Sequence, residues 1–129
     1  MVISLYSILK RQPEAALFAF AEKTAKTYAA YISGDAPLSE LTAYLESGTD
    51  FSRQVKAYSS YYYNKHNSID FQQLQVSAPA AWSADAFTAD VSFDFVVRRT
   101  YDSHTYPTRY RIAFRRSGKG FSVCNIQTM

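Results

Sequence analysis

The chain has 129 residues, the length of one domain, and its 47% of hydrophobic residues are enough to bury a core without disulfides or metal. The single cysteine, Cys124, excludes an internal disulfide and any cysteine-rich zinc site. The net charge is +3: residues 1–64 carry six basic and six acidic side chains, and residues 65–129 carry eight and five. So small an excess argues against a protein that binds nucleic acid through a broad basic surface.

The first nine residues, MVISLYSIL, are apolar but too few to cross a bilayer. Lys10 and Arg11 follow this apolar run, whereas a signal peptide carries its charges in front of the run. We therefore expect no membrane span in this chain. A domain trimmed from a longer anchored protein would begin in the same way, so we expect an extracytoplasmic location in that case and a cytoplasmic one otherwise.

Helical periodicity predicts three helices between about residues 13 and 64. The first begins near Pro13, carries Glu14 in its first turn and ends near Gly34. The second falls within residues 36–48, and the third follows Asp50, which we predict to be its N-cap. The apolar face of the first helix consists of Leu17, Ala21, Ala25, Tyr28 and Ile32.

From about residue 68 to residue 128 the apolar period changes from helical to two. The segments 68–77, 86–101, 108–116 and 121–129 are predicted strands, with 78–85 as a loop and a Gly-containing turn at 117–120. Three helices followed by four sequential strands predict one α+β domain over residues 1–129. In it, N-terminal helices pack on a curved antiparallel four-strand meander.

The arginine-rich stretch 92–116 is best explained as a β-hairpin with one polar face. A turn at Ser103-His104 would pair Phe93 with Phe114 and Phe95 with Ile112. The same register gathers Arg98, Arg109, Arg111, Arg115 and Asp94 on the opposite face, where Asp94 lies near Arg111 and Arg115. We interpret that face as solvated and expect no nucleic-acid partner, because the aromatic rings needed for base stacking lie on the other side.

Past Val97 the alternation places Arg99 and Tyr101 on the apolar face, close to the end of the hairpin. A charge there needs a partner or the rim of a cavity. A single β-bulge would reverse this assignment. The predicted ligand-binding residues at the pocket rim are Arg99, Tyr101, Tyr106, Tyr28 and Tyr58; the other interpretation of the many tyrosines is that they simply fill the core and its edge.

Groups that could perform catalysis are missing from the predicted interior. The inward positions of the clear strands hold only apolar residues and Tyr110, so no general base faces inward. His66 and His104 fall in or near predicted turns. The sequence has no metal-ligand spacing, phosphate-binding loop or nucleophile motif, so we predict no catalytic residue, metal or cofactor.

The long first helix ending TYAAYISGD, the strand FTADVSFDFVV and the C-terminal segment RYRIAFRRSGKGFSVCNIQTM together resemble the nuclear transport factor 2-like (cystatin-like cone) superfamily. That superfamily includes ketosteroid isomerases, dehydratases, polyketide cyclases and non-catalytic modules of bacterial envelope proteins, among them scaffold subunits of conjugation and type IV secretion machinery. The resemblance implies a fold, and a fold hosts many functions.

Two functions follow from the resemblance and from the base-free interior. The first is a non-catalytic ligand-binding or protein-assembly module of a bacterial, envelope-associated protein, with a small hydrophobic ligand or a protein as partner. The alternative is a small isomerase- or dehydratase-like enzyme acting on a hydrophobic small molecule, which requires Asp94 to turn inward or a loop histidine to fold over the pocket.

Self-association is a further expectation. A curved sheet often pairs through its convex side or its edge strands into a two-fold dimer. Here the convex side carries four arginines, which repel one another unless Asp94 or Asp90 of the second copy meets them. We therefore expect either a monomer or a weak, salt-sensitive homodimer. The tyrosines of YSSYYYN (residues 58–64) offer an apolar alternative surface.

Overall fold

The computed structural model describes residues 2–33, 36–57, 68–118 and 120–129, with side chains from residue 15 onward. Three helices precede the sheet: α1 (Val2–Ile32), α2 (Leu38–Thr42) and α3 (Asp50–Ala57). The strands are β1 (Ser68–Val76), β2 (Ala80–Ala81), β3 (Ala86–Arg98), β4 (Ser103–Ser117) and β5 (Gly120–Thr128). The protein is therefore an α+β fold with N-terminal helices and an antiparallel sheet, as predicted.

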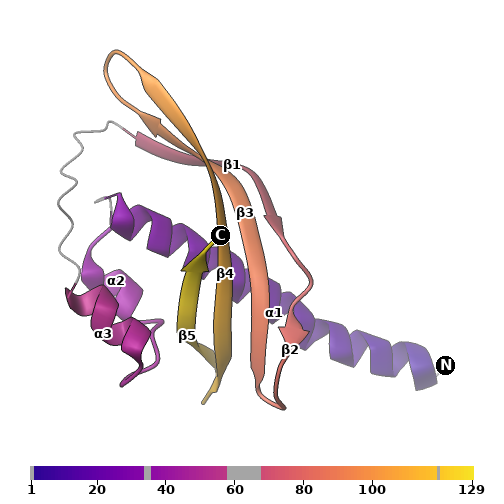
Figure 1. Ribbon diagram of the computed structural model, residues 1–129. Coiled ribbons are helices and arrows are strands. Elements are labelled where there is room, and N and C mark those ends of the chain that lie inside the picture. The colour runs from indigo at the N-terminus through magenta and orange to yellow at the C-terminus, as the bar shows by residue number, and fades with distance from the viewer. Residues whose placement is uncertain (1, 34–35, 58–67, 119) are drawn as a thin grey trace.

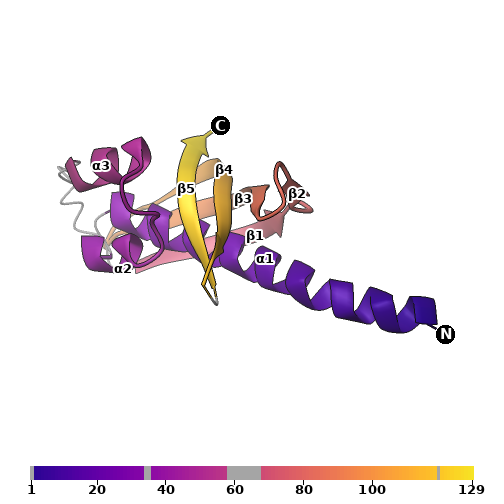
Figure 2. The ribbon, with the colours of Figure 1, turned by 90° about the horizontal axis from the view of Figure 1, so that it is seen from below.

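The sheet has the order β1-β3-β4-β5, and the short strand β2 pairs with β3 beyond the end of β1. Helix α1 crosses one face of this sheet, and α2 and α3 lie near the C-terminal end of α1 (Figures 1 and 2). None of the helices among the described residues lies on the other face of the sheet (Figures 1 and 2). None of the helices in the described part of the chain has the length and apolar content needed to span a bilayer.

Helix α1 begins at Val2, so the predicted start near Pro13 is wrong. Proline favours the first turn because it lacks an N–H group, but within a helix it removes only one backbone hydrogen bond and does not always end the helix. The predicted apolar face is confirmed, since Leu17, Ala21 and Ala25 are buried. The two alanines are fully buried, and their small side chains let α1 approach the sheet closely.

The register of the β3–β4 hairpin also differs from the prediction. Arg98 pairs with Ser103, and the Arg99 N–H donates to the Asp102 carbonyl at 2.8 Å, so the turn lies at residues 99–102 and not at Ser103-His104. Phe93 consequently pairs with Thr108 rather than Phe114. The displacement is even, so both registers place the same residues on each face, and the hydrophobic pattern cannot distinguish them.

The edge of the sheet beside β3 is irregular. β1 shifts register between Gln72 and Gln75, and Gln73 has a positive φ of 53°. Positive φ is uncommon outside glycine and marks a β-bulge here. The two residues of β2 lie in the segment that we predicted to be a loop, because two residues are too few to show alternation. The sheet therefore has five strands, not four.

One continuous core joins the helices to the sheet. As predicted, Phe93, Phe95, Ile112 and Phe114 are buried together, and the cluster includes Leu17 of α1. The Phe114 ring has its centroid 5.3 Å from that of Phe20, 5.9 Å from Phe87 and 5.7 Å from Phe121. These ring contacts connect α1 with three strands.

Replacing Phe114 with alanine should lower the free energy of unfolding by about 3–5 kcal/mol, because a fully buried aromatic side chain leaves a cavity. Trp82→Ala is the control: Trp82 is 53% exposed, and its loss should cost less than about 1 kcal/mol. Urea denaturation of both variants measures the difference. Equal losses for the two variants would contradict the position of the core.

Candidate interaction surface on the open face of the sheet

The face of the sheet toward α1 is filled with apolar and aromatic side chains. Among the described residues no carboxylate, histidine, lysine or arginine is buried; Thr24 and Ser52 are the buried polar residues. Burial, and to a lesser degree the neighbouring Tyr28, raises the pKa of Tyr110 above its ordinary value. Tyr110 therefore stays protonated and cannot act as a base.

The hydroxyl of Tyr31 is also committed within the interior. It donates to the Val55 carbonyl at 3.3 Å, which ties α1 to α3. The described residues thus offer hydroxyl groups and aromatic rings to the interior, but none of them could accept a proton there from a substrate near neutral pH. Asp94, which the enzymatic alternative would need inside, lies on the opposite face.

The opposite, open face carries the charged side chains of the hairpin. Arg111 donates to Asp90 through Nε–Oδ1 at 2.9 Å and Nη2–Oδ2 at 3.1 Å. Arg98 lies 3.6 Å from Asp70 and Arg115 lies 3.4 Å from Glu46. The predicted grouping of the arginines opposite the apolar residues is confirmed, but the acidic neighbour of Arg111 is Asp90 and not Asp94.

This correction follows from the register. Asp90 pairs directly with Arg111 across β3 and β4, whereas Asp94 pairs with Pro107. The hydrogen bond from Arg111 is the main reason why the pKa of Asp90 lies below its ordinary value, and charges of Arg111 and Arg109 lower it further. The repulsion expected among the arginines is therefore largely offset within one chain.

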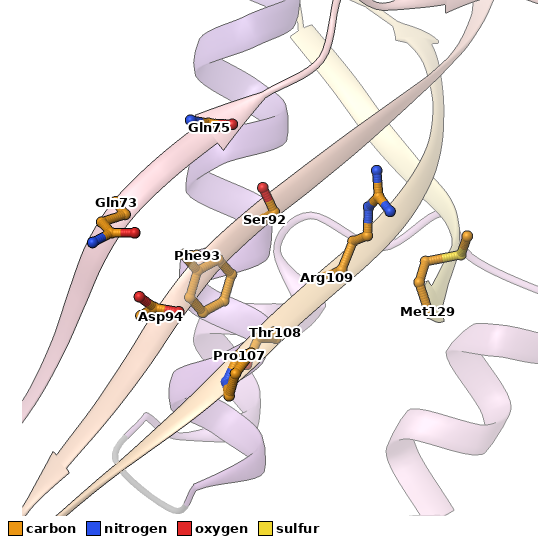
Figure 3. Close-up of a pocket in the computed structure, with 9 residues that line it drawn as sticks. All are labelled: Gln73, Gln75, Ser92, Phe93, Asp94, Pro107, Thr108, Arg109 and Met129. Atoms are coloured by element: carbon orange, nitrogen blue, oxygen red, sulfur yellow. The ribbon is translucent and has the colours of Figure 1, made fainter.

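Figure 3 shows a hollow on this face at the level of the β1 bulge. Its volume is about 430 Å³, and it is open to solvent. Asp94 and Gln73 lie on one side of it, and Arg109 and Met129 lie on the other (Figure 3). Neither Asp94 nor Arg109 forms a side-chain hydrogen bond or ion pair with another described residue. The lining residues are Gln73, Gln75, Ser92, Phe93, Asp94, Pro107, Thr108, Arg109 and Met129.

Two other hollows lie on the described surface. One, of about 440 Å³, lies further along the open face beside Asp90 and Arg111. The other is apolar, measures about 220 Å³, and lies between α1 and α3, where Tyr28 and Phe51 line it. The apolar hollow is smaller than the roughly 300–1,000 Å³ typical of small-molecule sites. The two larger hollows lie on the open face and are open to solvent, with mixed polar and apolar linings.

The structure does not bring the predicted rim residues together. Arg99 and Tyr101 lie in the hairpin turn, where Tyr101 is 98% exposed, and Tyr106 lies on β4 with 48% exposure. Tyr28 is on α1, with its ring 5.1 Å from that of Tyr110. The turn closes earlier than predicted, so Tyr101 lies at the tip of the hairpin. Tyr58, like His66 and the tyrosines at 61–63, lies outside the described residues.

Sequence reasoning missed Gln73 and the pairing of Asp90 with Arg111. The bulge at Gln73 has no signal in the sequence, since glutamine is not a residue that favours positive φ. His104, expected in a turn, is in β4, where its Nε2 lies 3.1 Å from Asp102 Oδ2. In the part of the chain that the structure describes, no three acidic, histidine or cysteine residues are grouped as metal ligands.

No family model, curated protein or solved structure matches this chain. What is established is the architecture, in which N-terminal helices pack against a five-strand antiparallel sheet.

Replacing Asp90 with asparagine should lower stability by no more than about 1 kcal/mol at neutral pH, because the ion pair with Arg111 is partly exposed to solvent. The pKa of Asp90 is lowered on folding, so its contribution is complete above the ordinary value of 3.8 and is lost as the pH falls through the lowered pKa. Urea denaturation at about pH 7 and about pH 2 should show the difference from wild type only at the higher pH.

Asp94→Asn is the matched control, since Asp94 has the same strand and face but no ion-pair partner in the described chain. It should leave stability unchanged at both pH values. If Asp94→Asn caused the larger loss, the assignment of Asp90 as the partner of Arg111 would be wrong.

Replacing Arg98, Arg109, Arg111 and Arg115 together with glutamine should leave the fold intact. Exposed ion pairs contribute little to stability, and the aliphatic part of each side chain is largely preserved. Circular dichroism and thermal unfolding measure the first result. Nucleic-acid binding by the wild type, measured by fluorescence anisotropy, should be weak and fall steeply with salt; tight, sequence-selective binding would contradict the solvated-face interpretation.

Proposed function

We propose that this domain is a non-catalytic protein-assembly module, built on the nuclear transport factor 2-like cone and belonging to an envelope-associated bacterial protein, and that it binds a partner protein through the open face of its sheet. The observation that carries the proposal is the contrast between the two faces. The interior is filled and contains no buried carboxylate, histidine, lysine or arginine among the described residues, whereas the open face carries the charges and the larger hollows.

The filled interior supports binding over catalysis. An isomerase or dehydratase needs an enclosed site with a base at hydrogen-bond distance from the substrate and donors for the developing oxyanion. The described interior has neither a base nor a space of the usual ligand volume. The resemblance to enzymes of the cone superfamily concerns the fold, and no specific observation favours the enzymatic alternative.

The open face has the composition of a protein-binding surface more than that of a small-molecule site. Its hollows are open to solvent and lined by polar and apolar surface in similar measure, and arginine, which is enriched in protein interfaces, lines both of them. Arg109 and Asp94 have charges that no side chain of the described chain satisfies by an ion pair. A partner with complementary charges can bind both groups at low desolvation cost, because they are already at the surface.

Arg109→Glu should weaken capture of a partner from the producing organism at least about tenfold, since it reverses a charge at the centre of the proposed surface. Lys56→Glu is the matched control: it makes the same charge change on an exposed residue of α3. Quantitative affinity purification of both variants and wild type measures the effect. Equal loss in both variants would mean that net charge alone governs capture and would contradict the proposed surface.

A second measurement addresses the interior. Wild-type protein should not enhance the fluorescence of an apolar dye such as anilinonaphthalene sulfonate, because the described interior has no space of the usual ligand volume. Tight dye binding by the wild type, together with an increase in its melting temperature, would favour the ligand-binding or enzymatic alternative.

A further inference from the structure

The strand β4 is longer than the partner on its outer side. β5 pairs with β4 only from Tyr110 to Ser117, and the last bond on this side runs from the Met129 N–H to the Arg109 carbonyl at 2.9 Å. Residues 103–108 pair with β3 on one side and, within the described chain, have no strand on the other. The distal half of the hairpin therefore has an open edge, and the hairpin extends past the end of β5 (Figure 1).

Alternate residues of β4 direct their backbone N–H and C=O groups to this open edge. In an antiparallel ladder, alternate residues direct both their N–H and C=O groups to the same neighbour. The Arg109 carbonyl faces β5, so Ser103, Thr105 and Pro107 direct their backbone groups to the open edge. Pro107 has no N–H, so this edge offers donors at Ser103 and Thr105 and only an acceptor at Pro107.

The open edge has little other protection. Natural sheets protect exposed edges with charged residues, proline or bulges. Residues 103–108 include no lysine, arginine, aspartate or glutamate, and His104 is their one basic side chain. Four large hydrophobic side chains are exposed in the described chain, and three of them border this edge: Tyr101, Tyr106 and Met129.

We infer that a second copy of this chain pairs with the open edge of β4, antiparallel and about a two-fold axis at Thr105. In this register, the two Thr105 residues exchange both of their backbone hydrogen bonds. The Ser103 N–H of each copy donates to the Pro107 carbonyl of the other, whereas the Ser103 carbonyl gains no bond in return because Pro107 has no N–H. An axis at Pro107 would place two prolines opposite each other and would extend over the part of the edge where Met129 already bonds Arg109, so it is less favourable than the axis at Thr105.

The side chains agree with this register. The pairing ends before Arg109, whose carbonyl already accepts from the Met129 N–H of its own chain. Tyr106 of one copy lies opposite His104 of the other. The contact is isologous, since each surface is its own complement.

The pairing is short, so the dimer should be weak, with a dissociation constant on the order of 0.1–1 mM. It should also be insensitive to salt, because backbone hydrogen bonds and apolar contacts carry most of it. A dimer through the charged open face would instead dissociate as salt is added. This inference rests on the proposed function as an assembly module, but a monomer that still captures a partner through Arg109 would overturn only the pairing.

Sedimentation equilibrium tests the inference at protein concentrations up to about 1 mM, in low and high salt. Thr105→Pro removes the central N–H without removing a bond to β3 and should weaken dimerisation at least about tenfold. Thr105→Val keeps that N–H and should dimerise as wild type does. Equal dimerisation of the two variants, or a wild type that is monomeric throughout, would overturn the inference; so would a dimer that high salt dissociates.

A cross-linking experiment is independent of these variants. In a Cys124→Ser background, Thr105→Cys should form an intermolecular disulfide under mild oxidation, because paired residues at the two-fold axis have Cα atoms about 5.5 Å apart. Thr108→Cys, which has no copy of itself opposite in this register, should not. Circular dichroism confirms folding of each variant, and equal cross-linking at both positions would contradict the register.

Discussion

The long pairing between β3 and β4 is the constraint on which the rest of the structure depends. It runs without a bulge from Ala86–Arg115 at one end to Arg98–Ser103 at the other. Because side chains alternate along both strands, this one ladder puts Val91, Tyr110 and Ile112 against α1 and leaves Asp90 and Arg111 on the open face. The core, the ion pairs and the open edge are consequences of where that ladder begins and ends.

The sequence predicted the faces of the hairpin correctly but not its register, and both outcomes have the same cause. Period-two alternation determines which residues share a face, and a shift of two, four or six positions leaves that unchanged. Register depends on the turn, and nothing in RTYDSHTYP distinguishes closure at Arg99–Asp102 from closure at Ser103-His104 strongly. The apolar face of α1 was predictable for a similar reason, while its beginning at Val2 was not.

The candidate surface was less predictable than the fold because it depends on register, not on pattern. The residue types of the open face could be identified, yet the acidic partner of Arg111 changed from Asp94 to Asp90 when the ladder moved. That change leaves Asp94 and Arg109 without ion pairs in the described chain, and both residues line the hollow of the open face. The bulge at Gln73 shapes one side of that hollow and could not be inferred from residue types.

The outer edge of the sheet is covered beside β5 and open beside residues 103–108 of β4. Beside β5, the segment after α2 acts as an additional short strand: the Glu46 N–H donates to the Val123 carbonyl at 2.8 Å, and the Val123 N–H donates to the Tyr44 carbonyl at 2.6 Å. Beyond the end of β5, Pro107 is the residue of the described chain that restricts strand pairing at the open edge of β4. Proline removes a donor but keeps an acceptor, so it restricts the possible registers without blocking the edge. A fully protected edge would prevent pairing, and an unprotected one would allow pairing in any register; one proline disfavours the registers that place its missing N–H at the centre of the pairing.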